Sequence, residues 1–206
     1  FGQEAYSSYF DSFMRHYLTM KTGNIPNIDE VYEEFKKYFY TSQRDNEEEL
    51  KELKKYTAYF CAMALDKEQD KELKEAFSDL SELKVDVSYP LLLELYNDYK
   101  MNILSKDDFI EIIRLIESYV FRRAVCGIPT NSLNKTFASF GKSIIKEKYL
   151  ESVKAHFNKM TSYRRFPNDE EFVTELTCRD LYNFRSRSYW LRRLENHDRK
   201  ERVNVS

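Results

Sequence analysis

Apolar residues recur along most of this chain with the spacing of an α-helix. Over residues 31–39 they fall on one helical stripe, and the same spacing recurs over residues 73–83. A third stripe covers residues 109–120 and is widened by further apolar side chains. The helix that carries this third stripe, predicted over residues 106–126, is therefore expected to be buried on most of its sides.

The whole pattern predicts an all-α fold, an irregular multi-helix bundle of about ten helices with no sheet. The chain holds only 4 Gly and 4 Pro in 206 residues, too few turn-forming residues for most all-β folds. The predicted helices cover residues 3–21, 28–42, 47–65, 69–83, 89–102, 106–126, 131–141, 145–162, 169–177 and 181–197.

Polar side chains that can accept hydrogen bonds from free backbone N–H groups mark three helix starts. Asn46, Ser105 and Asn168 each stand three positions before an acidic residue. Glycines predict helix ends, and the longest break lies near residues 127–131. This break is a candidate division between two lobes. No linker rich in Pro, Gly or Ser occurs, so one helical domain over residues 1–206 is the preferred prediction.

Composition places the chain among globular proteins of the cytoplasm. Hydrophobic residues make up 42% and charged residues 33%, and no apolar run approaches the roughly 18 residues of a membrane helix. Cys61, Cys126 and Cys178 are far apart in predicted helices, which is typical of buried reduced thiols. The chain begins with Phe1 rather than Met, and we therefore expect it to be a fragment of a longer chain.

Charge is distributed unevenly along the sequence. Residues 27–86 hold 17 acidic and 10 basic residues, whereas residues 179–206 hold 8 basic and 4 acidic residues. A basic segment interleaved with aromatic side chains is suited to the phosphates of double-stranded DNA. The candidate DNA contacts are Arg185, Arg187, Arg192, Arg193, Arg199, Lys200 and Arg202.

A second interpretation of the basic segment is charge neutralisation within the molecule. In it, Arg192 and Arg193 pair with Glu195 and with acids of the first half. If the first interpretation holds, replacing both arginines by Glu should abolish DNA affinity without unfolding the domain. A secondary pair of candidates, Arg122 and Arg123, ends the apolar helix, where the side chains can cap carbonyl groups or contact a phosphate.

No catalytic, cofactor-binding or metal-ligating residue is predicted. Residues 141–143 read Gly-Lys-Ser, like the end of a phosphate-binding loop, but Thr136 stands where that loop needs a glycine. A helix end is the better interpretation. His16, His156 and His197 are scattered, and no cysteine spacing is typical of zinc.

The stretch over residues 118–135 carries a family resemblance. It contains Ser-Tyr, Arg-Arg, Gly, Thr-Asn and Leu-Asn-Lys in the order found in GmrSD-type proteins, which are bacterial modification-dependent (type IV) restriction enzymes and their uncharacterised relatives. Residues 11–18, 89–94 and 189–201 resemble the same family. The likeness extends over the whole chain.

The resemblance implies a place in phage defence. Such proteins have an N-terminal nucleotide-binding domain with a D-G-Q-Q-R motif, a long helical region and a C-terminal HNH-type nuclease with an H-x-x-P motif. This chain is similar to the helical region and contains neither motif. The resemblance therefore predicts a non-catalytic region that links the two flanking domains, its partners, and contacts DNA through its basic segment. The alternative function is a protein-interaction or dimerisation module without a nucleic-acid role.

Overall fold

The computed structural model describes the backbone of residues 3–199 and the side chains of residues 9–199. Ten α-helices and no strand occur among them, which confirms the predicted all-α multi-helix bundle. The helices are α1 (Gln3–Thr22), α2 (Val31–Ser42), α3 (Asn46–Ala64), α4 (Lys71–Glu82), α5 (Tyr89–Lys100), α6 (Lys106–Val125), α7 (Leu133–Phe140), α8 (Tyr149–Lys159), α9 (Asp169–Cys178) and α10 (Arg187–Glu195).

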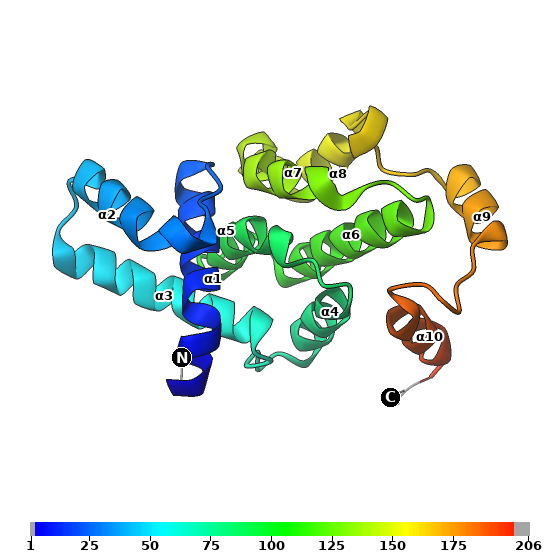
Figure 1. Ribbon diagram of the computed structural model, residues 1–206, viewed down its shortest axis with the longest axis horizontal. Coiled ribbons are helices and arrows are strands. Elements are labelled where there is room, and N and C mark those ends of the chain that lie inside the picture. Colours follow the sequence, from blue (N-terminus) through cyan, green and yellow to red (C-terminus); the bar gives the residue numbers. More distant parts are fainter. Residues whose placement is uncertain (1–2, 200–206) are drawn as a thin grey trace.

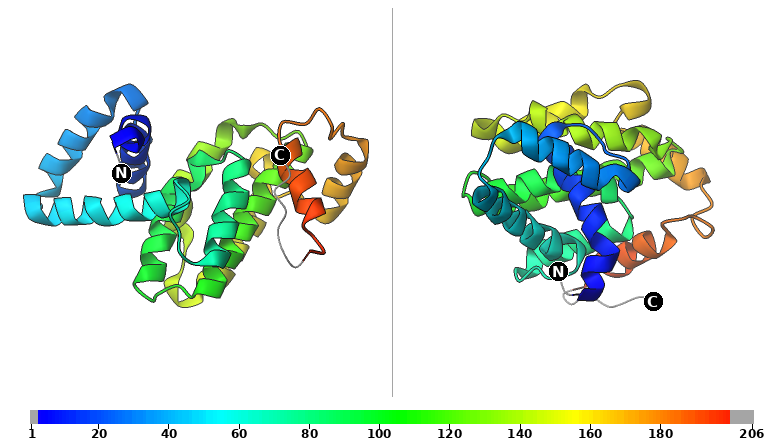
Figure 2. Two further views of the ribbon diagram at one scale, coloured as in Figure 1. Left: turned by 90° about the horizontal axis from the view of Figure 1, so that it is seen from below. Right: turned by 60° about the vertical axis from the view of Figure 1, so that its left-hand side comes forward.

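Helices α5 and α6 lie at the centre of the molecule (Figure 1). Helix α1 packs against α5, and together with α2 and α3 it forms the end of the molecule at the left of Figure 1. Helix α4 packs along α6, while α7 and α8 cover the upper side of α5 and α6. Helices α9 and α10 occupy the opposite end, and α10 contacts α4 (Figure 2).

The third stripe is buried as predicted. Phe109, Ile112, Ile113 and Ile116 on α6 have no exposed surface. One hydrophobic cluster extends from Phe13 on α1 to Tyr189 on α10 and includes residues on both sides of the 127–131 break. Burial of this apolar surface supplies the main driving force that holds the ten helices together.

Local side-chain chemistry explains most helix boundaries. The Ser105 hydroxyl accepts from the Asp108 N–H and the Asn168 amide oxygen accepts from the Glu171 N–H, so both predicted caps are confirmed. The predicted cap at Asn46 is wrong. Asp45 caps α3 by accepting from the Glu47 N–H, and Asn46 is the first residue of the helix.

Two further expectations need correction. The last helix begins at Arg187 rather than near residue 181, because the Asp180 carboxylate accepts from the backbone N–H groups of Tyr182 and Asn183 and stabilises a turn there. Cys178, expected to be buried, is exposed at the end of α9. Within the described residues, no helix has both the length and the apolar character that crossing a bilayer requires.

Candidate functional site

Helix α10 carries most of the predicted DNA contacts, and its aromatic residues dock it on the bundle. The Tyr189 ring is buried, with its centroid 5.0 Å from that of Phe121 on α6. The Tyr189 hydroxyl donates a 2.6 Å hydrogen bond to Glu117, also on α6. On the other side of the helix, the Trp190 indole donates to the carbonyl of Leu181. These contacts fix which face of α10 is turned toward α4 and α6.

The docked face of α10 completes a buried ionic network. Asp79 on α4 and Glu117 on α6 are 1% and 2% exposed. The Arg114 guanidinium lies 2.6 Å from both carboxylates. From α10, Arg192 lies 3.0 Å from Asp79, and Arg193 lies 3.4 Å from Asp79 and 3.4 Å from Glu117. Three arginines therefore neutralise two acids that are removed from water.

This network assigns Arg192 and Arg193 a role inside the molecule. Arg192 also pairs with Glu82, and only 12% of its side chain is exposed. The acids of the first half are thus partners of both arginines, as the second interpretation held, whereas the expected pairing with Glu195 is wrong because Glu195 pairs with Arg199. Glutamates at both positions would face Asp79 and Glu117 at close range, so we now expect this replacement to destabilise the domain rather than leave it folded.

The other basic candidates of this segment lie in different surroundings. Arg199, which follows α10 in the chain, pairs with Glu195, the last residue of that helix. Arg185 and Arg187 are exposed, and neither has an ion pair with an acid in the described part of the chain. Lys200 and Arg202 lie outside the described residues. Among the described candidates of this segment, Arg185 and Arg187 are the two whose charges face solvent without a paired acid.

The second arginine pair ends α6, and Arg123 is almost completely buried there. Its side chain is 1% exposed, and its guanidinium donates to the carbonyls of Tyr163 and Pro129 and to the Ser132 hydroxyl, at 2.6, 2.7 and 3.2 Å. All three acceptors lie outside α6, so the Arg123 guanidinium fastens two neighbouring turns to the end of the helix rather than capping the carbonyls of α6 itself. Burial lowers the pKa of the Arg123 guanidinium, since the charged form is separated from water. Arg123 cannot itself contact an external phosphate in this conformation.

Arg122 points to the other side of α6 and fastens the start of α9. Its guanidinium lies 2.6 Å from Asp169 and donates to the Pro167 carbonyl at 3.2 Å. The same group lies over the Phe172 ring, 4.9 Å from its centroid. Arg122 thus offsets charge at an acidic helix start and holds the chain that follows α8.

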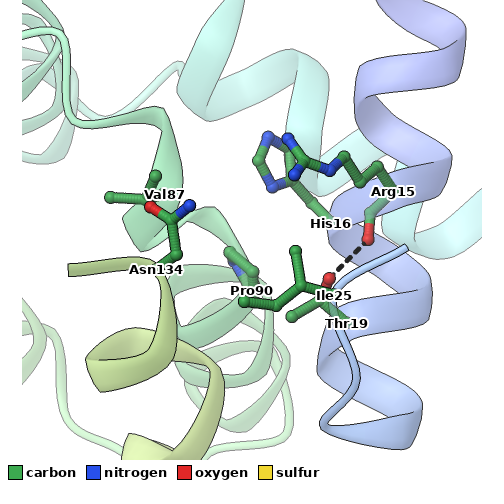
Figure 3. A pocket seen from close by; sticks show the side chains of 7 residues that line it. All are labelled: Arg15, His16, Thr19, Ile25, Val87, Pro90 and Asn134. Atoms are coloured by element: carbon green, nitrogen blue, oxygen red, sulfur yellow. Dashed lines mark hydrogen bonds between the residues drawn. The ribbon is translucent and has the colours of Figure 1, made fainter. Parts of the chain in front are cut away.

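A small cavity lies between α1, α5 and α7, beside His16 (Figure 3). Its volume is ≈ 20 Å³, which suits a water-sized molecule and no cofactor. The His16 ring packs against Phe60 and Tyr89. Burial, helped by the neighbouring Arg15 charge, lowers the pKa of His16 to about 4. A neutral imidazole in an apolar setting is a structural group rather than a general base poised near neutral pH.

Other chemistry-bearing residues do not converge. No group of three or more His, Cys, Asp or Glu side chains arranged to hold a metal ion occurs among the described residues. Residues 141–143 form a short 3₁₀ turn after α7, as the helix-end interpretation held. No family model matches the chain, and no curated protein or solved structure gives a significant match to it. The resemblance to GmrSD-type proteins therefore stays a prediction.

Sequence reasoning missed the two buried acids, although a signal was present. Ala76, Asp79 and Leu83 are spaced so that one helix face carries all three, and Glu117 continues the spacing of Ile113 on α6. A carboxylate on an apolar stripe requires a buried cation as partner. The arginines of a distant basic segment were available for that role.

Proposed function

We propose that this chain is the helical region of a GmrSD-like restriction protein. In this proposal it is a non-catalytic region that links a nucleotide-binding domain to an HNH-type nuclease. The observation that supports the proposal best is the buried network of Asp79 and Glu117 with Arg192 and Arg193, which fastens the last described helix to the centre of the bundle. A displacement at the C-terminal end is thereby coupled to α4 and α6.

The positions of the described ends agree with this role. The start of α1 and the end of α10 both lie toward the lower edge of the molecule in Figure 1. Domains attached at the two ends would then project from the same side of the bundle. Helices α4 and α10, which the network joins, lie between that side and the central helices. The proposed route of coupling is short and consists of packed helices with paired charges.

Direct DNA contact in this proposal is limited to Arg185 and Arg187 among the described residues. Both stand in or next to the start of α10, away from the network, and their charges are free to pair with phosphates. The decisive test compares the native chain with R185Q/R187Q in a salt-titrated gel-shift assay, using plain, methylated and glucosylated duplexes. We expect binding that weakens steeply with salt and a salt slope smaller by roughly 2 in the variant.

The control variant K54Q/K84Q removes two exposed lysines from the acidic half and should bind DNA like the native chain. An absence of binding at low salt would exclude DNA contact by this chain and leave the linking role alone. The linking role itself fails if the parent gene encodes no D-G-Q-Q-R motif upstream and no H-x-x-P motif downstream.

A specific observation also favours the alternative, an interaction module. Tyr32, Tyr40 and Leu50 on α2 and α3 are 70%, 77% and 66% exposed, within the acidic segment. Exposed apolar side chains on an acidic surface suit a basic, partly apolar protein partner or a second copy of the chain. Light scattering coupled to gel filtration distinguishes the second copy. Loss of a dimer on replacing Tyr40 and Leu50 by Ser would support it, and a monomer at all concentrations would exclude it.

A further inference from the structure

A hollow of ≈ 410 Å³ opens beside the buried Arg123. Its walls come from two turns that are distant in sequence. One is the 3₁₀ turn Thr130–Ser132 with the first residues of α7, and the other is the 3₁₀ turn Ser162–Arg164 after α8. The residues that line the hollow are Pro129, Asn131, Ser132, Lys135, Tyr163 and Arg164.

Positive charge gathers in this hollow without acidic neighbours. None of its six lining residues is an acid. Neither Lys135 nor Arg164 forms an ion pair or a side-chain hydrogen bond with another described residue. The Nε group of Arg164 is buried and donates to no described acceptor. Two cations therefore face the same space with their charge uncompensated.

Arg123 adds a third charge behind the wall. Its guanidinium bonds to Pro129, Ser132 and Tyr163, which are all lining residues, so it holds both turns in place. Among the described residues no carboxylate pairs with Arg123, and its Nε is buried without an acceptor. A buried cation with only neutral partners is costly, and an anion within a few ångströms would offset part of that cost.

We infer that the hollow binds the phosphate group of a small phosphorylated molecule. A dianionic, tetrahedral phosphate suits the donor groups carried by the residues that line the hollow, which are the Lys135 ammonium, the Arg164 guanidinium, the Asn131 amide and the Tyr163 hydroxyl. The volume exceeds that of a phosphate group and leaves room for part of the molecule that carries it. Arg123 acts as a positioning residue. Its charge adds to the positive electrostatic potential of the hollow, and its hydrogen bonds hold the two turns that form the walls. The site is separate from Arg185 and Arg187, so it does not rest on the proposed function.

The test is a titration of the ¹⁵N-labelled chain with inorganic phosphate, followed by amide chemical shifts. Potassium chloride keeps the ionic strength constant. We expect saturable shifts confined to residues 131–135 and 162–165. In K135Q/R164Q the affinity should fall at least roughly tenfold, about 1.4 kcal/mol, since two charged donors are lost. In the matched control K54Q/K84Q, which also removes two cations, phosphate binding should stay native.

Two outcomes would overturn the inference. One is the absence of saturable shifts in the native chain, and the other is an equal response in K135Q/R164Q, which would reveal general counterion binding. The two substitutions remove no ion pair or side-chain hydrogen bond between described residues, only the contact of Arg164 with the Tyr163 ring, so the variant should fold, and K135Q alone provides a milder check. A short DNA duplex added in a separate arm identifies the source of the phosphate. If the duplex shifts the same amides and competes with phosphate, the site takes a nucleic-acid backbone instead of a small molecule.

Discussion

Two arginine pairs each lie in the last turn of an α-helix, and the fold treats the charges of Arg192 and Arg193 in the opposite way to the charge of Arg123. Arg192 and Arg193 at the end of α10 meet the carboxylates of Asp79 and Glu117. Arg123 at the end of α6 is more deeply buried, and its partners are carbonyl and hydroxyl oxygens and the ring of Tyr119, with no carboxylate among the described residues. Favourable interaction with the helix dipole explains the shared position, but it does not decide the partners. A pair of arginines in a sequence therefore indicates where positive charge lies, but not which group each guanidinium contacts.

The largest effect is expected from Ile113→Asp, which should disrupt both regions together. Ile113 is fully buried on α6, the helix that carries Glu117 and Arg123. A carboxylate there would have no partner, and we expect a loss of about 5 kcal/mol or more in the free energy of unfolding. Thermal melting by circular dichroism measures it. The control Glu111→Asp, exposed on the same helix, should melt like the native chain, and a folded Ile113→Asp would show that the stripe is not core.

Asp79→Ala should break the paired region alone. Arg192 and Arg193 would lose a buried carboxylate partner, and unfolding should become easier by about 4 kcal/mol. The single tryptophan, Trp190, lies on α10 and reports its undocking by fluorescence. The control Glu47→Ala removes an acid from an exposed pair with Lys51 and should cost less than about 1 kcal/mol. Equal effects of the two variants would mean that the network adds nothing to stability.

His16 is a third buried base, and it sharpens the comparison because it stays neutral in the folded chain, whereas the arginines keep their charge. The folded pKa is about 4, below the ordinary value of 6.5. As the pH falls below 6.5, His16 in the unfolded chain takes up a proton, whereas His16 in the folded chain stays neutral until about pH 4. The free energy of unfolding therefore decreases between pH 6.5 and 4 and keeps its full value above pH 6.5. The expected loss is about 3 kcal/mol.

Urea unfolding between pH 4 and 7 measures this dependence as the difference between the native chain and His16→Gln. That difference in the free energy of unfolding should decrease by about 3 kcal/mol as the pH falls from 6.5 to 4, as expected for one titrating group. His197→Gln is the control, because the His197 side chain is 81% exposed. A histidine proton titration of the folded chain that places His16 near pH 6.5 would contradict the prediction directly.

The smallest expected effect comes from Arg123→Lys, which tests the carbonyl-bonded region alone. A lysine keeps the charge but cannot reach three acceptors with the planar fork of a guanidinium. We expect a loss of about 2 kcal/mol in the free energy of unfolding, measured in urea. The control Arg187→Lys, on an exposed site, should change stability by less than about 0.5 kcal/mol. An unchanged midpoint in Arg123→Lys would show that charge, not shape, is what this position requires.

The sequence predicted which helix faces are buried because the period of apolar residues records that directly. The stripe with Ile113 and the caps at Ser105 and Asn168 were of this local kind. The partners of the arginines were not predictable in the same way. Asp79 and Arg192 are 113 positions apart, and no pattern in the sequence between them indicates that the two side chains are in contact. Likewise, the hollow beside Arg123 exists only because two turns about 30 positions apart in sequence are brought together by the fold.

The separation of Asp79 from Arg192 also sets an order of events during synthesis of the chain. A ribosome adds roughly 5–20 residues per second, so α4 leaves it on the order of 10 seconds before α10 is complete. From the emergence of α6 until the arrival of α10, the nascent bundle presents the carboxylates of Asp79 and Glu117 on an open surface, with Arg114 as their neighbour. The arrival of α10 closes this surface and ends the assembly of the described fold. A translating chain halted before residue 187 should therefore expose an acidic face that the finished molecule hides.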